Sequence, residues 1–154
     1  MRDLEKVLRQ AAKQTVEDVG KEVKAITQEE IDKAVYSIPE GQYKRTGDLR
    51  NSLQNYPVEE KGHMYEVEIK HDVTKMRANP SQFQHASPYW SPWDYRRYVA
   101  QTVHDGLSGS LFGTAGHWLQ PKPYFDNTKE RLNSNKEHVK AAKDSLKKQG
   151  FTVK

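Results

Sequence analysis

Histidine is the side chain best suited to metal binding or proton transfer near neutral pH, and the sequence holds six. They are His63, His71, His85, His104, His117 and His138. None stands at helical or short-loop spacing from a second histidine with a third ligand nearby. His71 and His104 each directly precede an aspartate, and we expect such adjacent side chains to diverge. Because the chain has no cysteine, thiolate metal sites and disulfides are excluded. We expect no metal and no cofactor.

The sequence also argues against nucleophilic and phosphoryl-transfer chemistry. A Gly-x-Ser-x-Gly elbow is absent, since the stretch from Gly106 to Gly109 is one residue too short. The glycines between residues 106 and 116 are not followed by Lys-Ser or Lys-Thr, as a phosphate-binding loop requires. Paired carboxylates such as Glu66 and Glu68 are expected on the wet face of a strand. We therefore expect a protein that is not an enzyme.

The composition predicts one domain over residues 1–154, with a frayed tail from about residue 150. Only 34% of the residues are hydrophobic, so the core must be small. A small core indicates either dependence on a partner or oligomer, or a monomer with flexible polar ends, and the two remain open. The 25 basic and 21 acidic residues are well mixed, and only Lys136 to Lys154 is clearly basic, which favours a solvated face. No apolar run or signal-like segment appears, so we expect a soluble protein made in a reducing cytoplasm.

Apolar residues at helical spacing predict a helical region from residue 2 to about 36. Thr27 and Glu30 form a possible capping box that would split this region near residue 27, and Gly20 is a weaker candidate break. Residues 48–56 fit a helix or a strand equally. Strict alternation over 63–71 predicts a half-buried strand, and the two segments together predict an antiparallel hairpin.

The second half of the chain reads as loops and two helices. Residues 72–93 form a long aromatic-rich loop that serves as a contact surface or caps its own core. A short helix follows from about 93 to 104, then a flexible glycine-rich loop over 106–116. A last helix runs from about 124 to 148 and stops at Gly150. The fold class is α+β: a long N-terminal helical region, a small antiparallel sheet, a short middle helix and a long C-terminal helix.

The most distinctive stretch runs from Tyr43 to Leu53 and reads Tyr-Lys-Arg-Thr-Gly-Asp-Leu-Arg-Asn-Ser-Leu. Its Thr-Gly pair predicts a turn, and Leu49 and Leu53 predict buried anchors. This stretch resembles a motif of small neck or tail-component proteins of tailed bacteriophages, a family typified by gene product ten of phage Hong Kong 97. Family members show Arg-Thr-Gly-x-Leu-Arg-x-Ser-apolar after an N-terminal helical region.

A second set of matches lies downstream in the same order, so that the resemblance covers about residues 1–148. The family pattern Tyr-x-x-Tyr-Val, then a Phe-Gly-Thr turn, then a Pro-aromatic helix start is met here. The family's usual acidic residue after Tyr-Val is replaced by Gln101-Thr102, and the 72–93 loop is enlarged. The residues that carry the resemblance, and the candidate interface, are Arg45, Thr46, Gly47, Leu49, Arg50, Ser52, Tyr95, Tyr98, Phe112, Gly113, Pro123 and Phe125.

The resemblance implies a head–tail connector, neck or tail-completion adaptor of a tailed phage or prophage. Such a protein has no catalytic site and acts through interfaces formed on assembly. The implied partners are other phage structural proteins on the portal and tail-tube sides, and further copies of the chain in a ring, with a monomer when free. The implied location is the virion neck or tail. DNA would be only channel content, facing Lys44, Arg45 and Arg50. Competing expectations are a basic nucleic-acid-binding module and a small hydrolase with a cleft.

Overall fold

The computed structural model describes residues 2–37, 47–76, 92–111 and 114–153, and the side chains of 3–37, 47–76, 99–106 and 120–153. It has the predicted α+β architecture. Helix α1 (Arg2–Ile31) continues into a π-helical turn, η1 (Asp32–Tyr36), so the predicted N-terminal helical region is confirmed. None of the helices in these ranges is both long and apolar enough to cross a membrane.

The break predicted inside α1 near residue 27 is wrong. Thr27 is buried, and its hydroxyl donates to the carbonyl of Val23 at 2.8 Å, one turn back along the same helix. Glu30 bonds Lys33 and Arg131 instead of capping a new helix. Gly20 does not break the helix either, because its role is to leave room for a neighbouring strand.

A long, interrupted hairpin packs against α1. Helix α2 (Asp48–Ser52) leads into β1 (Leu53–Asn55), so the undecided segment 48–56 is helix first and strand second. Strand β1 pairs antiparallel with β4 (Ile69–His71), and β2 (Glu59–Lys61) pairs antiparallel with β3 (Met64–Glu66). The predicted alternation is confirmed, since residues 65, 67 and 69 are half-buried and residues 66, 68 and 70 are exposed.

The glycine-rich region after α3 is a second hairpin, so the flexible loop predicted over 106–116 is wrong. Helix α3 (Pro92–Asp105) matches the predicted short helix and follows a 3-10 turn, η2 (Val73–Lys75). Strands β5 (Leu107–Leu111) and β6 (Thr114–Leu119) then pair antiparallel, with Gly109 opposite Gly116. Glycine weakens a strand by only about 1 kcal/mol, so backbone pairing overrides the local signal.

The predicted single helix over 124–148 is two helices, α4 (Tyr124–Asn135) and α5 (Glu137–Lys148). The break is at Lys136, whose φ of 55° is left-handed. Its N–H donates to the Leu132 carbonyl at 3.1 Å, which ends α4. The predicted stop at Gly150 is confirmed, with φ +89° and an N–H that donates to Lys147.

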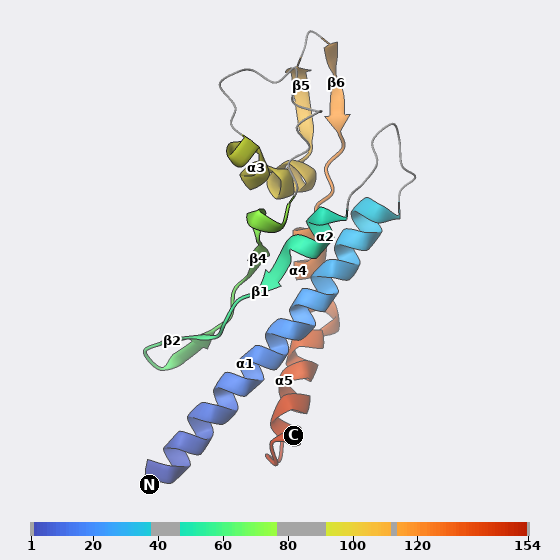
Figure 1. Cartoon of the computed structure of the whole chain (residues 1–154). Coiled ribbons are helices and arrows are strands. Elements are labelled where there is room, and N and C mark those ends of the chain that lie inside the picture. The colour runs from blue at the N-terminus through green and yellow to red at the C-terminus, as the bar shows by residue number, and fades with distance from the viewer. Residues whose placement is uncertain (1, 38–46, 77–91, 112–113, 154) are drawn as a thin grey trace.

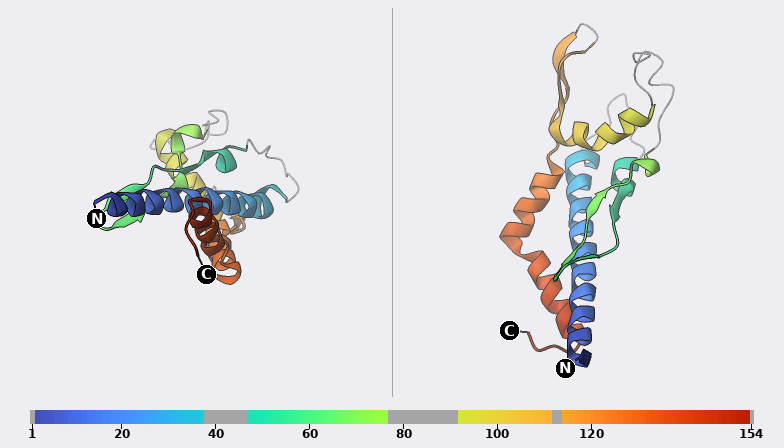
Figure 2. Two further views of the ribbon diagram at one scale, coloured as in Figure 1. Left: turned by 90° about the horizontal axis from the view of Figure 1, so that it is seen from below. Right: turned by 90° about the vertical axis from the view of Figure 1, so that its left-hand side faces the viewer.

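Helix α1 is the spine of an elongated molecule (Figure 1). The hairpin of β1–β4 lies along one side of α1, and α4 and α5 lie along another (Figure 2). The core sits towards the C-terminal end of α1, where six buried side chains cluster: Ile31, Val35, Leu49, Leu53, Met76 and Tyr124. Beyond this core the β5–β6 hairpin projects from one end of the molecule, and the first turns of α1 project from the other.

Candidate functional site

The distinctive motif begins α2 and points two of its side chains into the core. Gly47 has a φ of +76°, a left-handed conformation that favours glycine, and its carbonyl accepts from the N–H of Asn51 at 3.0 Å. Leu49 is 7% exposed and Ser52 is fully buried. Arg50 points outward and pairs with Asp32 at 3.4 Å. The motif therefore supplies two buried core residues, Leu49 and Ser52, and one charged surface residue, Arg50.

Ser52 starts a buried chain of hydrogen bonds, here named the Ser52–His71–Tyr124 chain. The Ser52 hydroxyl donates to the carbonyl of Leu49 at 2.8 Å and lies 2.8 Å from Nδ1 of His71. Nε2 of His71 lies 3.1 Å from the Tyr124 hydroxyl, which also lies 3.2 Å from the carbonyl of Ala100. The Ser52 hydroxyl gives its proton to Leu49, so Nδ1 of His71 carries a proton and donates to Ser52. The one proton of the Tyr124 hydroxyl is then shared between two acceptors, the carbonyl of Ala100 and Nε2 of His71.

Aromatic rings surround this chain. The His71 ring meets the Tyr124 ring edge-on at 5.8 Å between centroids, and it meets Phe125 at 5.7 Å. The His104 ring contacts Tyr124 at 5.6 Å from the end of α3. Edge-to-face contacts of this kind add to the stabilisation that burial provides. The chain and its rings therefore join α2, β4, α3 and α4.

Burial decides the charge state of this cluster. It lowers the pKa of His71 to about 4 and raises the pKa of Tyr124 above its usual value, so both side chains are neutral near pH 7. Ser52 and Tyr124 have no exposed surface. A nucleophile has to reach its substrate, so this serine and histidine are arranged as a structural link rather than as a catalytic pair.

Several of the predicted site residues meet at this link. Leu49 belongs to the core cluster against which Phe125 packs, and Ser52 bonds His71, whose ring contacts Phe125. Pro123 precedes α4, and its carbonyl accepts from Asn127 at 2.9 Å. Arg45, Thr46, Phe112 and Gly113 lie outside the described residues, as does Lys44. Tyr95 and Tyr98 lie in α3, with side chains outside the described set.

His71 is the site residue that sequence reasoning missed. The alternation over 63–71 puts residue 71 on the same inward face as Val67 and Ile69, which indicates that the side chain is partly buried but not what it contacts. The predicted divergence from Asp72 is confirmed, since that carboxylate accepts from Thr74. The same prediction is wrong for His104, whose Nδ1 lies 2.7 Å from Oδ1 of Asp105 because both side chains turn to one side at the end of α3.

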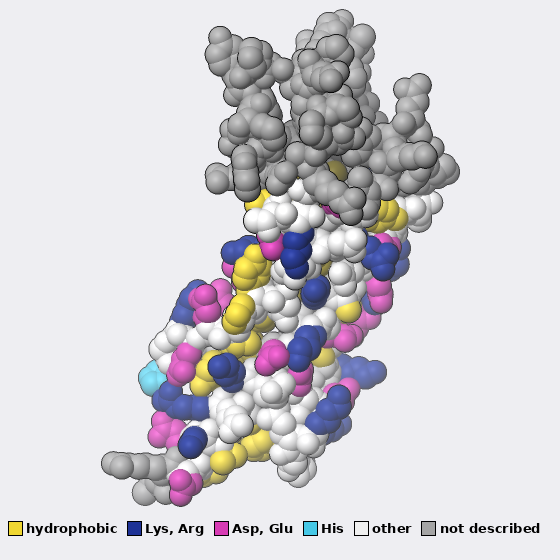
Figure 3. Space-filling view, in the orientation of Figure 1, with side chains coloured by type: hydrophobic (Ala, Val, Ile, Leu, Met, Phe, Trp, Pro, Cys, Tyr) yellow, Lys and Arg dark blue, Asp and Glu magenta, His cyan; other side chains and the backbone are white. Residues whose placement is uncertain are grey.

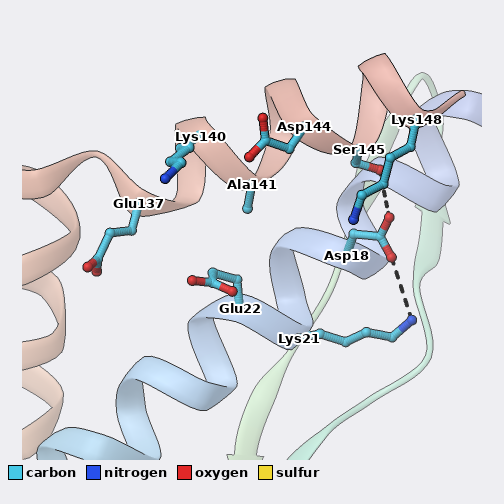
Figure 4. Close-up of a pocket in the computed structure, with 9 residues that line it drawn as sticks. All are labelled: Asp18, Lys21, Glu22, Glu137, Lys140, Ala141, Asp144, Ser145 and Lys148. Carbon is cyan, nitrogen blue, oxygen red and sulfur yellow. Dashed lines mark hydrogen bonds and ion pairs between the residues drawn. The ribbon is translucent and has the colours of Figure 1, made fainter. Parts of the chain in front are cut away.

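A groove of about 550 Å³ lies between α1 and α5 (Figure 4). Charged side chains of both signs line it, and Ser145 donates to Asp18 across it at 2.7 Å. That hydrogen bond lowers the pKa of Asp18, so the carboxylate stays ionised and is unsuited to acid catalysis at neutral pH. Within the described ranges no group of histidine and acidic side chains is placed to hold a metal ion.

Comparison with known proteins identifies a family. The YomN family model matches residues 1–148, and the chain therefore belongs to the YomN family. No curated protein and no solved structure matches the chain.

Proposed function

We propose that this member of the YomN family is a non-enzymatic structural protein of a tailed bacteriophage or prophage. It acts as a head–tail connector, neck or tail-completion adaptor and assembles into a ring between the portal side and the tail-tube side. It is made in the bacterial cytoplasm and ends in the virion. The proposal starts from the motif resemblance over residues 43–53 and 95–125.

The observation that carries the proposal is the distribution of the core along an elongated chain. Buried apolar side chains cluster around the C-terminal end of α1. The β5–β6 hairpin and the first turns of α1 extend from opposite ends of this core (Figures 1 and 2). Elements that extend beyond their own core offer surface to neighbours, as an adaptor between two larger assemblies requires.

The buried motif residues support the same proposal. Leu49, Ser52 and Phe125 converge on the link that joins four elements. A motif that maintains the scaffold leaves the exposed segments free to make contacts with neighbouring proteins. In this proposal the motif specifies the fold of the adaptor, and the projecting elements make its contacts.

The alternative of a nucleic-acid-binding module gains little from the charge distribution. Lysines and arginines are interspersed with acidic side chains on the face in Figure 3. Many of them are ion-paired, including Arg9 with Glu60 at 2.7 Å and Arg131 with Glu29 at 2.6 Å. Binding to phosphates would compete with these pairs. DNA remains in the proposal only as the content of the channel.

Electron microscopy of lysates tests the role in the phage that encodes the chain. A nonsense mutation in the gene is expected to leave filled heads and finished tails that do not join. Supplying the intact protein from a plasmid is expected to restore joined, infectious particles. Normal particles without the protein, or a defect confined to DNA replication, would contradict the proposal.

A further inference from the structure

The first turns of α1 carry apolar side chains that the described chain leaves uncovered. Leu4 is 64% exposed, Val7 53% and Leu8 49%. Every residue from Asp3 to Gln10 is exposed, whereas Ala11 is buried. Figure 1 shows this end of α1 reaching beyond the last turn of α5. The exposed residues therefore lie just past the point where intramolecular packing stops.

These three residues continue the face of α1 that binds α5. Gln149, at the end of α5, donates to the Ala11 carbonyl at 3.5 Å and to the Thr15 hydroxyl at 3.2 Å. Further along, Ser145 donates to Asp18. At 100° per residue, positions 4, 7, 8, 11, 15, 18 and 22 fall within an arc of about 100°. The uncovered side chains are thus an extension of a face already built to receive a helix.

We propose that this face binds the same face of a second copy of the chain, with the two α1 helices antiparallel. The first turns of each α1 would then lie against α1 of the other copy, in line with that copy's α5 and just beyond its end at Gly150. A two-fold arrangement of this kind is self-complementary, because it places Leu4 of one copy opposite Leu8 of the other. The proposal goes beyond the connector role and does not depend on it.

Charge favours this occupant and this direction. The first turn of α1 carries Asp3 and Glu5, and the last turn of α5 carries Lys147 and Lys148. In the antiparallel arrangement, the acidic first turn of one α1 begins where the basic last turn of the other copy's α5 ends. A parallel arrangement would instead bring two acidic first turns and two positive helix ends together.

The size of the contact sets its strength. Two helical turns from each copy bury less than the roughly 1,200 Å² typical of stable protein complexes. The dimer is therefore weak, and it forms only at high protein concentration or where copies are already held close together. A free protein that is monomeric when dilute is part of the expectation.

Sedimentation equilibrium of the purified full chain, up to about 1 mM, tests the contact. The wild-type mass is expected to rise from monomer towards dimer with concentration. Leu8→Glu is expected to stay monomeric, because it places a charge in the apolar contact without touching the core. The matched control is Val139→Glu, which alters another exposed apolar side chain, on α5, and should dimerise as wild type does. A wild-type monomer throughout this range, or a dimer that survives Leu8→Glu, would overturn the proposal.

Disulfide trapping tests whether the two α1 helices are antiparallel. The chain has no cysteine of its own, so only the introduced cysteines can cross-link. Leu4→Cys and Leu8→Cys proteins, mixed and oxidised, are expected to form a mixed dimer. Each protein alone is expected to cross-link little, since equivalent positions lie several residues apart along antiparallel helices and exceed disulfide reach. Efficient cross-linking of each variant alone, with no mixed dimer in the mixture, would exclude the antiparallel contact. Because both tests use the protein by itself, their failure leaves the connector role untouched.

Discussion

At the residue scale, the hydroxyl of Tyr124 holds the buried link together. It lies 3.1 Å from Nε2 of His71 and 3.2 Å from the carbonyl of Ala100, and the side chain has no exposed surface. Removing it leaves Nε2 of His71 and the carbonyl of Ala100 without the one proton that they share. Leaving a buried polar group unpaired costs more free energy than an average hydrogen bond contributes, so loss of this hydroxyl should lower the stability measurably.

We expect Tyr124→Phe to lower the free energy of unfolding by about 1–3 kcal/mol. The ring stays in place, so the loss isolates the hydroxyl. Urea unfolding followed by circular dichroism measures the change. Tyr56→Phe serves as the control, because the Tyr56 ring lies under Lys70 and its hydroxyl bonds to no described residue. Equal stability of the two variants would show that the link is not formed in solution.

His71 makes the stability of the fold depend on pH. Its pKa is about 4 in the folded chain, against 6.5 for the free side chain, because burial disfavours the charged ring. Between these two values the unfolded chain binds a proton that the folded chain does not. The free energy of unfolding is therefore expected to fall by about 2–3 kcal/mol as pH drops from 6.5 to 4, and the remaining loss from His71 below pH 4 is under about 1 kcal/mol.

Urea unfolding across this pH range measures the effect. His71→Gln removes the titrating ring and should flatten the dependence. His63→Gln, in the exposed turn of the hairpin, should leave the dependence as it is in the wild type. If His71→Gln shows the same pH slope as the wild type, the charge state assigned to the link is wrong.

Of the three residues of this link, the sequence motifs placed Ser52 among the site residues and left out His71 and Tyr124. The motif placed Leu49 among the anchors and included Ser52 and Phe125 among the site residues. It did not single out His71, because no local pattern says that a histidine at the end of one strand will meet a tyrosine fifty-three residues later. That contact depends on how α4 returns to the hairpin, which is a property of the tertiary fold.

At the element scale, Gly20 lets the hairpin approach α1. A Cβ at this position would lie 2.8 Å from Oδ1 of Asn55 and 3.0 Å from Cγ2 of Val67. At a solvent-exposed position inside a helix, Gly→Ala stabilises the helix by about 1 kcal/mol. Here we expect Gly20→Ala to destabilise instead, by about 1–2 kcal/mol, because overpacking outweighs helix propensity.

A double-mutant cycle with Asn55→Ala checks the cause. Thermal unfolding should show a smaller loss for Gly20→Ala in the Asn55→Ala background, since one of the two obstructing side chains is gone. If Gly20→Ala stabilises the wild-type background, the close approach of hairpin and helix would be refuted.

Lys136 stores strain at the joint between α4 and α5. A left-handed backbone costs a non-glycine residue about 1 kcal/mol or more, and the exposed side chain of Lys136 gains little from its position. We expect Lys136→Gly to raise the thermal unfolding midpoint by a few degrees. Lys143→Gly, at an exposed position inside helix α5, should lower the midpoint. A lower midpoint for Lys136→Gly would mean that the two helices are continuous in solution.

The elements themselves show what periodicity can predict. The long apolar stripe of α1 was sufficient for the main helix. The alternation over 63–71 predicted which side chains face inward, but the single strand predicted there is two strands, β3 and β4, which pair in separate sheets. The break at Lys136 was missed because the seven-residue spacing of apolar side chains continues through it, although Asn133, Ser134 and Asn135 before it are poor helix formers. Arg131 bonds Glu29, Glu30 and Glu137 beside this joint, which is a tertiary feature. The β5–β6 hairpin was hidden by its glycines, which read locally as a loop.

At the scale of the whole molecule, α1 is a spine with a small core near its C-terminal end and projecting elements at both ends (Figure 1). The low share of hydrophobic residues predicted this small core. Dependence on a partner was one of the two explanations that the sequence left open. The projecting ends favour that explanation. They also make the account testable, because an adaptor should change its assembly state when its neighbours are present.

Light scattering of the purified protein, alone and mixed with the portal and tail-tube proteins encoded nearby, measures this directly. We expect a mostly monomeric chain when it is dilute and alone, and a ring or a larger stable complex with at least one of the two partners. Leu4→Glu and Val139→Glu, compared in the same mixtures, would show whether the projecting end of α1 takes part. A chain whose mass stays that of a monomer with both partners would contradict the proposed role.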